Sequence, residues 1–367
     1  MRSEAQKNIL DSLPKEDLLS SGVDLSEKGR AATFVQVDER PSLFRSMFQG
    51  IELIPTEEAL NRYPQYKKFF GMAFTAVGED FPRDTQGGFF LVIKKGAKVT
   101  LPVQVCLFLK KKSFSQKVHN IILVEEGAQA YVINGCASDK AATDAFHLGI
   151  SEYIVMRNGY LNFTMIHSWN DSMVVRPKSI AVVEEGGTFV SNYVSLKPVK
   201  EVVMYPTCVL KGRKARASFS SIILGHKGCL QDVGSRVILA APDTSAEIVS
   251  RTVSMGGKII ARGHLYAKTP GVRAHLECQG LIVSEQGTIH AIPELQTDYR
   301  DVDLSHEAAI GKISKEEIEY LASRGIEEKV ARSLIIRGFM DTDILGLPDE
   351  LREQIEELKE RLTEQAM

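Results

Sequence analysis

The chain of 367 residues lacks several features, and each absence excludes a class of protein. No two cysteines are separated by only two residues, which excludes a zinc ribbon or a ferredoxin-type cluster site. Neither a Gly-x-x-x-x-Gly-Lys-Ser/Thr run nor a dinucleotide-binding fingerprint occurs, so any ATP hydrolysis must come from a separate subunit. No window reaches the roughly 18 apolar residues of a membrane-spanning helix, so no membrane association is expected.

The charge balance and the cysteines are typical of a globular protein of the cytoplasm. The formal net charge is −2, whereas a general nucleic-acid binder carries a basic excess. The basic runs at residues 110–112 and 211–216 are interpreted as solvated turns. The five cysteines are odd in number and widely spaced, and the first residues form no apolar signal-peptide core. We therefore expect reduced, mostly buried thiols and no disulfide framework.

The first part of the chain, residues 1–86, is predicted to be a mixed region that contains helices. Residues 3–13 have the pattern of a short helix. Thr56 precedes two glutamates, which indicates a second helix with Thr56 as its N-cap. The aromatic residues of the segment 63–70 are expected to anchor this region to the rest of the protein.

From about residue 87 to residue 302, short β-branched runs alternate with turns. A glycine follows one or two charged residues at Gly96, Gly127, Gly159, Gly186 and Gly212. The spacing of about 30 residues is typical of a stacked architecture. Glycine suits turns that need a positive φ. A β-helix, a β-sandwich and a barrel all fit short strands with little helix, and the repeat favours the β-helix over an ordinary meander of hairpins.

The last residues, 303–367, are predicted to form a helical subdomain. Ser314 and Glu317 form a capping box, and Gly325 is expected to end that helix. A second helix is predicted from residue 327 to about 337, ended by Gly338, and Pro348 is expected to open a third. The pattern leaves open whether these helices form a surface for a partner or a solvated end cap.

Several motifs, in order along the chain, carry a resemblance to a known family. They are Gly135-Cys136-Ala137-Ser138, His167-Ser168-Trp169, the segments 205–210 and 225–226, the segment 278–293, and the tail segments 305–313, 320–326 and 331–339. With these motifs the chain resembles the SufB/SufD family, the core subunits of the Suf iron–sulfur cluster assembly machine. The segment 22–28 is similar to that of the short, archaeal-type members.

The resemblance implies a right-handed parallel β-helix with a helical C-terminal subdomain. It also implies that an ABC-type ATPase subunit, SufC, docks on that subdomain. The residues assigned to this docking are Tyr320, Arg324, Gly325, Arg332 and Ile336. Further implied partners are a sulfur donor, apo-protein recipients and a second SufB/SufD-type chain. The short length fits a homodimer that replaces the SufB–SufD pair, and a heterodimer stays open.

The resemblance also assigns the chemistry. It places the scaffold cysteine of SufB at Cys278, with His306 and Glu307 as further ligands of a transient cluster, expected to be [4Fe–4S]. His306 and Glu307 are adjacent and would point to opposite faces of a regular strand, so His306 is the favoured ligand. The alternative interpretation of His306 is a polar cap residue before the helix. At position 305 the chain has a serine, where the larger proteins of the family usually carry an acidic residue. Reduced flavin, a family association, is left open.

Cys136 matches an internal cysteine of SufB proteins, which suggests sulfur entry there, with persulfide passed along the β-helix interior. A buried core thiol is the alternative, and Cys208 and Cys229 are interpreted as structural. The function predicted is a scaffold without turnover of its own. The alternatives are a SufD-like structural partner, against which Cys278 and Glu307 argue, and a β-helical carbohydrate-active enzyme, against which the lack of clustered aspartates argues.

Overall fold

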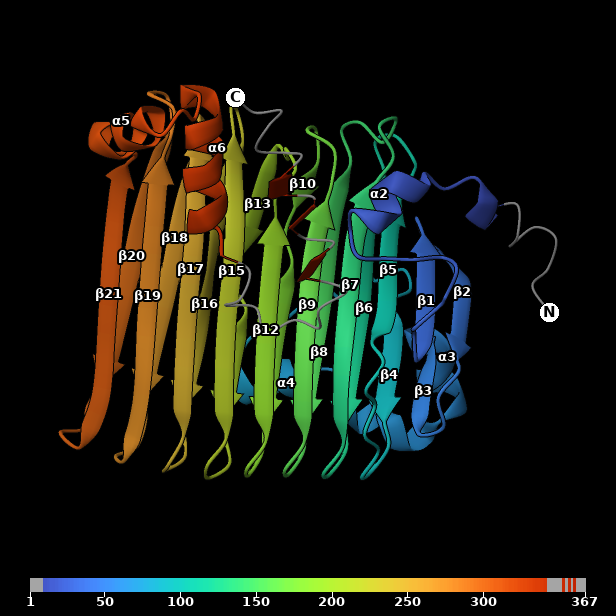
Figure 1. Ribbon diagram of the computed structural model, residues 1–367. Coiled ribbons are helices and arrows are strands. Elements are labelled where there is room, and N and C mark those ends of the chain that lie inside the picture. Colours follow the sequence, from blue (N-terminus) through green and yellow to red (C-terminus); the bar gives the residue numbers. More distant parts are fainter. Residues whose placement is uncertain (1–8, 342–351, 354–355, 358, 361–367) are drawn as a thin grey trace.

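The computed structural model describes residues 9–341, 352–353, 356–357 and 359–360. The chain winds through successive coils, each of which adds one strand to a front sheet and one to a back sheet (Figure 1). Almost all neighbouring strands are parallel and lie about one coil apart in sequence. The predicted parallel β-helix is confirmed.

The front sheet has ten strands in the described residues. In spatial order they are β2 (Arg40–Ser46), β1 (Ala32–Val37), β5 (Val103–Leu109), β7 (Gln129–Ser138), β9 (Tyr160–Ser168), β12 (Thr188–Ser195), β15 (Arg216–His226), β17 (Ser245–Met255), β19 (Val272–Ile282) and β21 (Val302–Lys312).

The back sheet has eleven strands in the described part of the chain. They are β3 (Ile51–Pro55), β4 (Phe89–Ile93), β6 (Ser115–Val124), β8 (Phe146–Val155), β10 (Val174–Val175), β11 (Lys178–Val183), β13 (Glu201–Met204), β14 (Thr207–Leu210), β16 (Leu230–Leu239), β18 (Lys258–Ala267) and β20 (Thr288–Thr297).

The core lies between the two sheets and is built by alternation along each strand. On β19, Val272, Ala274, Leu276 and Cys278 belong to the buried interior, and the residues between them point outward. Because the strands pair in register, each interior position repeats on the next coil as a row of side chains. Stacked rows of apolar side chains exclude water from the interior and supply most of its stability.

The turns between coils use glycine in two different ways. Gly96, Gly127 and Gly186 have positive φ, as predicted. At the other two repeats the left-handed residue is Asn158 or Lys214, and the neighbouring glycines 159 and 212 are needed for space. A Cβ atom on residue 212 would lie 2.0 Å from the backbone nitrogen of residue 185. The basic run at residues 110–112 lies in the loop between β5 and β6, and the run at 211–216 lies in the turn before β15 and at its first residue; both are largely exposed, as predicted.

The N-terminal region contributes both helices and strands. Its helices are α2 (Lys15–Leu19), α3 (Thr56–Arg62), the 3-10 helix η1 (Pro64–Phe69) and α4 (Met72–Val77). The strands β1, β2 and β3 of this region join the two sheets. The prediction that Thr56 is an N-cap is wrong: Pro55 precedes the helix, and the Thr56 hydroxyl donates to the His119 carbonyl at 2.7 Å. Tyr66 and Phe69 pack against the back sheet, as expected.

The described C-terminal helices are α5 (Lys315–Ser323) and α6 (Glu328–Phe339). The capping box of Ser314 and Glu317 is present, and Gly325 has a positive φ. Gly338 does not end the second helix, which continues to Phe339 because α6 is held by packing on the front sheet. The predicted helix after Pro348 lies mostly outside the described residues. No described helix is both long enough and apolar enough to cross a membrane.

Candidate functional site

Cys278 lies on β19 with its side chain in the interior, where it is only 2% exposed. Its neighbours in register are Ser250 on β17 and Ala308 on β21. Burial raises the pKa of the Cys278 thiol to about 11, and the nearby Glu277 carboxylate adds to this. Arg251, paired with Glu277 at 2.8 Å on the outer face, acts in the opposite direction. The thiol is therefore protonated at neutral pH until a metal or a base takes its proton.

His306 and Glu307 lie within the regular strand β21, which continues to Lys312. His306 is in register with Leu276, an interior residue, so its ring is on the same face as the Cys278 thiol. Glu307 is in register with Glu277 and points outward. The interpretation of His306 as a cap before a helix is therefore wrong. The structure brings His306 and Cys278 to one face, as diagonal neighbours typically about 7–8 Å apart, and leaves Glu307 on the other.

The site lies at the last coil of the β-helix. Within the described residues, β21 pairs only with β19 and β20 pairs only with β18, so each strand has a free edge. Both His306 and Glu307 are exposed. The interior-facing Leu295 and Ile310 of this coil are 38% and 43% exposed. Among the described residues, no group of three or more His, Cys, Asp and Glu side chains is placed to hold a metal ion.

Cys136 lies far from this end, on β7, with its side chain buried in the interior. Burial raises the pKa of its thiol well above the usual value. Its neighbour in register on β9 is His167, whose Nδ1 lies 3.0 Å from the Tyr193 hydroxyl. Burial lowers the pKa of His167 to about 3, so the imidazole is neutral. Thiol and imidazole thus share a dry, uncharged environment.

Two buried polar atoms near Cys136 make no hydrogen bond. They are the indole Nε1 of Trp169 and the amide Oδ1 of Asn134. Trp169 contacts both His147 and His167, with ring centres 4.9 and 5.6 Å apart. Asn134 lies on the same strand as Cys136, on the same interior face. An unpaired buried donor and acceptor are rare in native interiors.

The remaining thiols are all buried, in agreement with the expected reduced, internal cysteines. Cys208 faces the interior from β14, and its pKa is raised by burial. Cys106 packs under the N-terminal segment on the outer side of the front sheet. Cys229 accepts a hydrogen bond from the Val199 amide at 3.4 Å, which fits a structural role.

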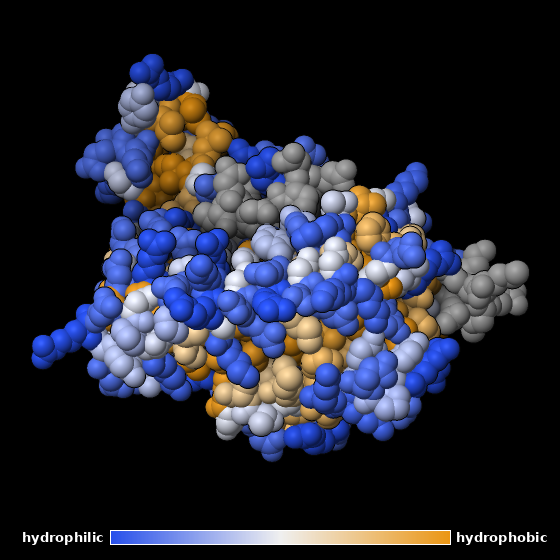
Figure 2. All heavy atoms as spheres, turned by 90° about the horizontal axis from the view of Figure 1, so that it is seen from below, coloured by the Kyte–Doolittle hydropathy of each residue, from blue (hydrophilic) through white to orange (hydrophobic). Residues whose placement is uncertain are grey.

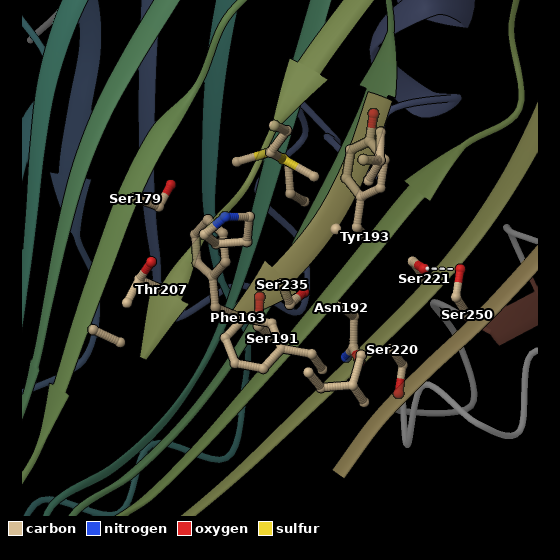
Figure 3. Close-up of a pocket in the computed structure, with 18 of the residues that line it drawn as sticks. Phe163, Ser179, Ser191, Asn192, Tyr193, Thr207, Ser220, Ser221, Ser235 and Ser250 are labelled. Carbon is tan, nitrogen blue, oxygen red and sulfur yellow. Dashed lines mark hydrogen bonds between the residues drawn. The ribbon is translucent and has the colours of Figure 1, made fainter. Parts of the chain in front are cut away.

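A cavity lies in the interior of the coils between those of Cys136 and Cys278, and neither of these two thiols is part of its lining (Figure 3). It has about 40 Å³ of space for water-sized molecules. Its lining includes Tyr153 and Tyr193, the hydroxyls of Ser179 and Ser235, and the pair Ser221 and Ser250, in which one Oγ donates to the other at 3.0 Å. At one end the Tyr193 hydroxyl lies 3.0 Å from Nδ1 of His167, the neighbour of Cys136 in register. At the other end Ser250 is the neighbour of Cys278 in register.

The residues predicted to dock a partner lie on the two described C-terminal helices and in the turn between them. Tyr320 is 59% exposed, and the Arg324 guanidinium stacks on its ring at 5.3 Å. Gly325 is exposed, whereas Arg332 is partly exposed and paired with Glu328. Ile336 is buried between α6 and the front sheet. Figure 2 shows apolar side chains gathered on this projecting helical lobe, where Val330 and Leu334 are exposed.

Sequence reasoning did not find the interior hydroxyls or the tyrosines beside Cys136. A signal was present, because Ser221, Ser250 and Cys278 are about one coil apart in the sequence and stand in one row in the structure. Aligning the repeats coil by coil would have placed these three residues in one row. The ion pair of Arg251 and Glu277 could not be found in this way, because the two residues are not in register with each other.

Comparison with known proteins agrees with this architecture. A family model described as "SUF system FeS cluster assembly, SufBD core domain" matches residues 107–339. The chain is 46% identical over 345 residues to an iron–sulfur cluster assembly SufBD family protein of Archaeoglobus fulgidus, which covers 93% of both chains. It is 39% identical over 346 residues to such a protein of Methanothermobacter thermautotrophicus, covering 92% of this chain and 84% of the relative.

A third relative carries a more specific name. The iron–sulfur cluster assembly protein SufB of Bacillus subtilis is 35% identical over 269 residues, which is 72% of this chain and 57% of SufB. The fold and these matches define a β-helical protein of the iron–sulfur cluster assembly class. The chain belongs to the SufBD family, and the resemblance found in the sequence is confirmed.

Proposed function

We propose that this chain is the scaffold on which a transient iron–sulfur cluster, of the [4Fe–4S] type, is built between two copies of the chain. The observation that carries the proposal is the last coil, where His306 stands on the same face as Cys278 on a strand with a free edge. One thiolate and one imidazole are too few ligands for a cluster. Two symmetric copies that meet at this end would double the set.

The edge of β21, which is free within the described residues, supports the pairing of two copies. An unpaired edge presents a row of N–H and C=O groups, which a second identical strand related by a two-fold axis can satisfy in antiparallel fashion. Leu295 and Ile310 are apolar residues that such a contact would bury. Glu307 points away from the interior, so it would take part only from the outer face.

The cluster is cargo rather than a resident cofactor in this proposal. Cys278 would lose its thiol proton on binding iron, because thiolate is the form that ligates. Its raised pKa makes the bond easier to reverse, since a proton competes well for the sulfur, and a reversible site suits a cluster that must leave for a recipient protein. Cys136 would receive sulfur and the interior would carry it toward Cys278.

The test is anaerobic reconstitution with iron and sulfide, followed by measurement of bound iron and acid-labile sulfide. We expect the wild type to bind a cluster and Cys278→Ser and His306→Ala to lose most of it. Cys208→Ser, which removes another interior thiol, is the matched control and should bind as the wild type does. Equal amounts in wild type and Cys278→Ser would refute the scaffold site. No cluster in any variant would favour a SufD-like partner role.

We also propose that a SufC-type ATPase docks on the lobe formed by α5 and α6. The support is the exposed apolar and aromatic surface of Tyr320, Val330 and Leu334 beside Arg324. Such residues are enriched at the centres of protein interfaces. Leu334→Asp should weaken ATPase binding at least about tenfold, which is about 1.4 kcal/mol. An exposed substitution on β2, Phe44→Asp, should leave the affinity unchanged. Equal affinities of both variants would refute the assignment.

A further inference from the structure

An open groove lies on the outer face of the front sheet, where β15, β17, β19 and β21 begin, at the lower end of these strands in Figure 1. This outer groove has about 400 Å³ of space for water-sized molecules. A row of side chains in register crosses it, made of Arg216, Ser245, Arg273 and Asp303. Glu247 and His275 stand two residues further along β17 and β19. Because successive side chains of a strand alternate between its faces, these residues point away from the interior that holds Cys278.

Two arginines of the outer groove differ from the other arginines of the β-helix. Between residues 87 and 297 the other arginines each bind an acidic side chain at 2.8 Å or less, and they are Arg157, Arg176, Arg213, Arg236, Arg251 and Arg262. Arg216 and Arg273 are exposed and form no ion pair with any described residue. Two positive charges that the described fold leaves unpaired in one groove are available to a negatively charged group of a ligand.

Small hydroxyl side chains form the floor between these two arginines. Ser245 lies between Arg216 and Arg273 in the row, and Ser218 lies two residues along β15 from Arg216. Two strand spacings place the backbones of the arginines about 10 Å apart, so both long side chains can reach one group above Ser245. A guanidinium group holds a carboxylate with two parallel hydrogen bonds, and a serine hydroxyl can donate another. This side of the groove is therefore suited to a carboxylate.

The outer groove also carries negative charge. Glu247 lies two residues along β17 from the serine floor, a distance of about 7 Å, and Asp303 lies beside Arg273 on β21. Neither carboxylate forms an ion pair with a described residue. The His275 ring is already engaged, since its Nδ1 lies 2.9 Å from the Ser305 Oγ. The two carboxylates would repel a phosphate or another dianion, whereas they would hold an ammonium group.

We propose that the outer groove binds an α-amino acid, with the carboxylate of the ligand between Arg216 and Arg273 and its ammonium group at Glu247. The unpaired charges of the groove are of both signs and match a ligand that carries one charge of each sign. A single carbon joins the two groups of an α-amino acid, so the Glu247 side chain meets the ammonium group by extending toward Ser245. Pockets for small molecules measure about 300–1,000 Å³, so the groove also has room for the side chain of the ligand. The proposal is independent of the cluster site, because none of these residues is a proposed cluster ligand.

The experiment is equilibrium dialysis of the full chain against a mixture of the radiolabelled L-amino acids that occur in proteins, followed by identification of the retained amino acid. We expect saturable retention of at least one of them. Acetate and methylamine each carry only one of the two charges, so each should compete at least about tenfold more weakly than the retained amino acid. A wild type that retains no amino acid would overturn the proposal, and so would acetate that competes as well as the amino acid does.

Two variants test the two sides of the groove separately. Arg273→Gln and Glu247→Gln each remove one charge from an exposed side chain and keep it polar, and each should raise the Kd at least about tenfold. The matched control is Arg300→Gln, which changes an exposed arginine without a described acidic partner outside the groove and should bind as the wild type does. An unchanged Kd in Arg273→Gln or in Glu247→Gln would overturn the proposal. Thermal unfolding checks that the variants are folded, and the competition by acetate and methylamine decides without them.

Discussion

The two ends of the β-helix differ in whether the interior face of the terminal coil is covered. A stack of coils leaves the interior face of its first and last coil without a neighbour. At the N-terminal end the interior residues Phe34, Leu53 and Phe89 are buried. At the C-terminal end the equivalent residues Leu295 and Ile310 are exposed. The interior of the first coil is therefore covered within the described part of the chain, whereas the interior face of the last coil stays exposed there.

The N-terminal end is also protected along its edges. Its outer strands β2 and β3 are antiparallel to their neighbours, and β2 carries Pro41, which has no N–H to offer, between the charged residues Arg40 and Arg45. Proline and charge on an edge strand prevent further pairing. At the C-terminal end β20 carries Pro293 and Glu294, and β21 has charges at Asp303, Glu307 and Lys312, so the described edge lacks both devices only along the run 308–311 of β21. The contrast between the ends can be tested by changing one residue at each.

The largest effect is expected from Ile310→Asp at the C-terminal end. A carboxylate in place of an apolar side chain on each copy would bring like charges together at the proposed contact, and the chain should become monomeric and lose nearly all of its cluster-binding capacity. Phe44→Asp changes a residue of similar exposure, 39%, at the N-terminal end and should alter neither. Sedimentation and bound iron report both properties. A dimeric Ile310→Asp would show that the copies do not meet at the last coil.

The next effect concerns the helices that cover the N-terminal half. Glu152, fully buried on β8, binds His119 at 2.8 Å and accepts hydrogen bonds from the amides of Gly71 and Ala73 at 2.6 and 2.8 Å. Glu152→Ala removes the carboxylate that binds the His119 ring and both backbone amides. Loss of a buried partner of this kind costs about 3–5 kcal/mol, measured as the free energy of unfolding in urea. Glu126→Ala, which breaks exposed ion pairs, should have little effect. A small change in Glu152→Ala would mean that α4 is held by apolar packing alone.

The smallest effect is a loss of stability in acid. Burial lowers the pKa of His147 and His167 to about 3 in the folded state, against about 6.5 when unfolded. Between these values the unfolded chain binds more protons, so stability falls as the pH falls below 6.5. From pH 6.5 to 5 each histidine contributes a loss of about 2 kcal/mol in the free energy of unfolding. His167→Gln should flatten this slope by about half, and the exposed His290→Gln should not. A pH-independent stability would show that these imidazoles are not buried neutral.

Much of the fold followed from the repeat, because a recurring turn and short β-branched strands leave few architectures. The capping box at Ser314 was predictable because its two partners are only three residues apart in the sequence. The strands β1, β2 and β3 carry no copy of the repeat, and the places of β1 and β3 in the sheets depend on pairing with the distant strands β5 and β4. Long-range pairing of that kind leaves no local pattern.

The site was predictable only in part. The residue types Cys278 and His306 came from the resemblance, but their shared face depends on β21 being a regular strand in register with β19. The opposite orientation of Glu307 follows from the same register. The cavity and its hydroxyls could not be predicted from the composition, because serine is equally common on outer faces. A serine points inward only if it lies an even number of residues from another interior position on the same strand.

The in-register stacking has one more consequence, which concerns length. Every coil advances the chain by one strand spacing of about 4.8 Å and returns it to the same set of rows. The number of coils therefore sets the distance between the two ends. Inserting a whole coil between β12 and β15 would move the two ends apart by one strand spacing and leave each end and each row intact. A part of a coil would shift every row beyond it out of line.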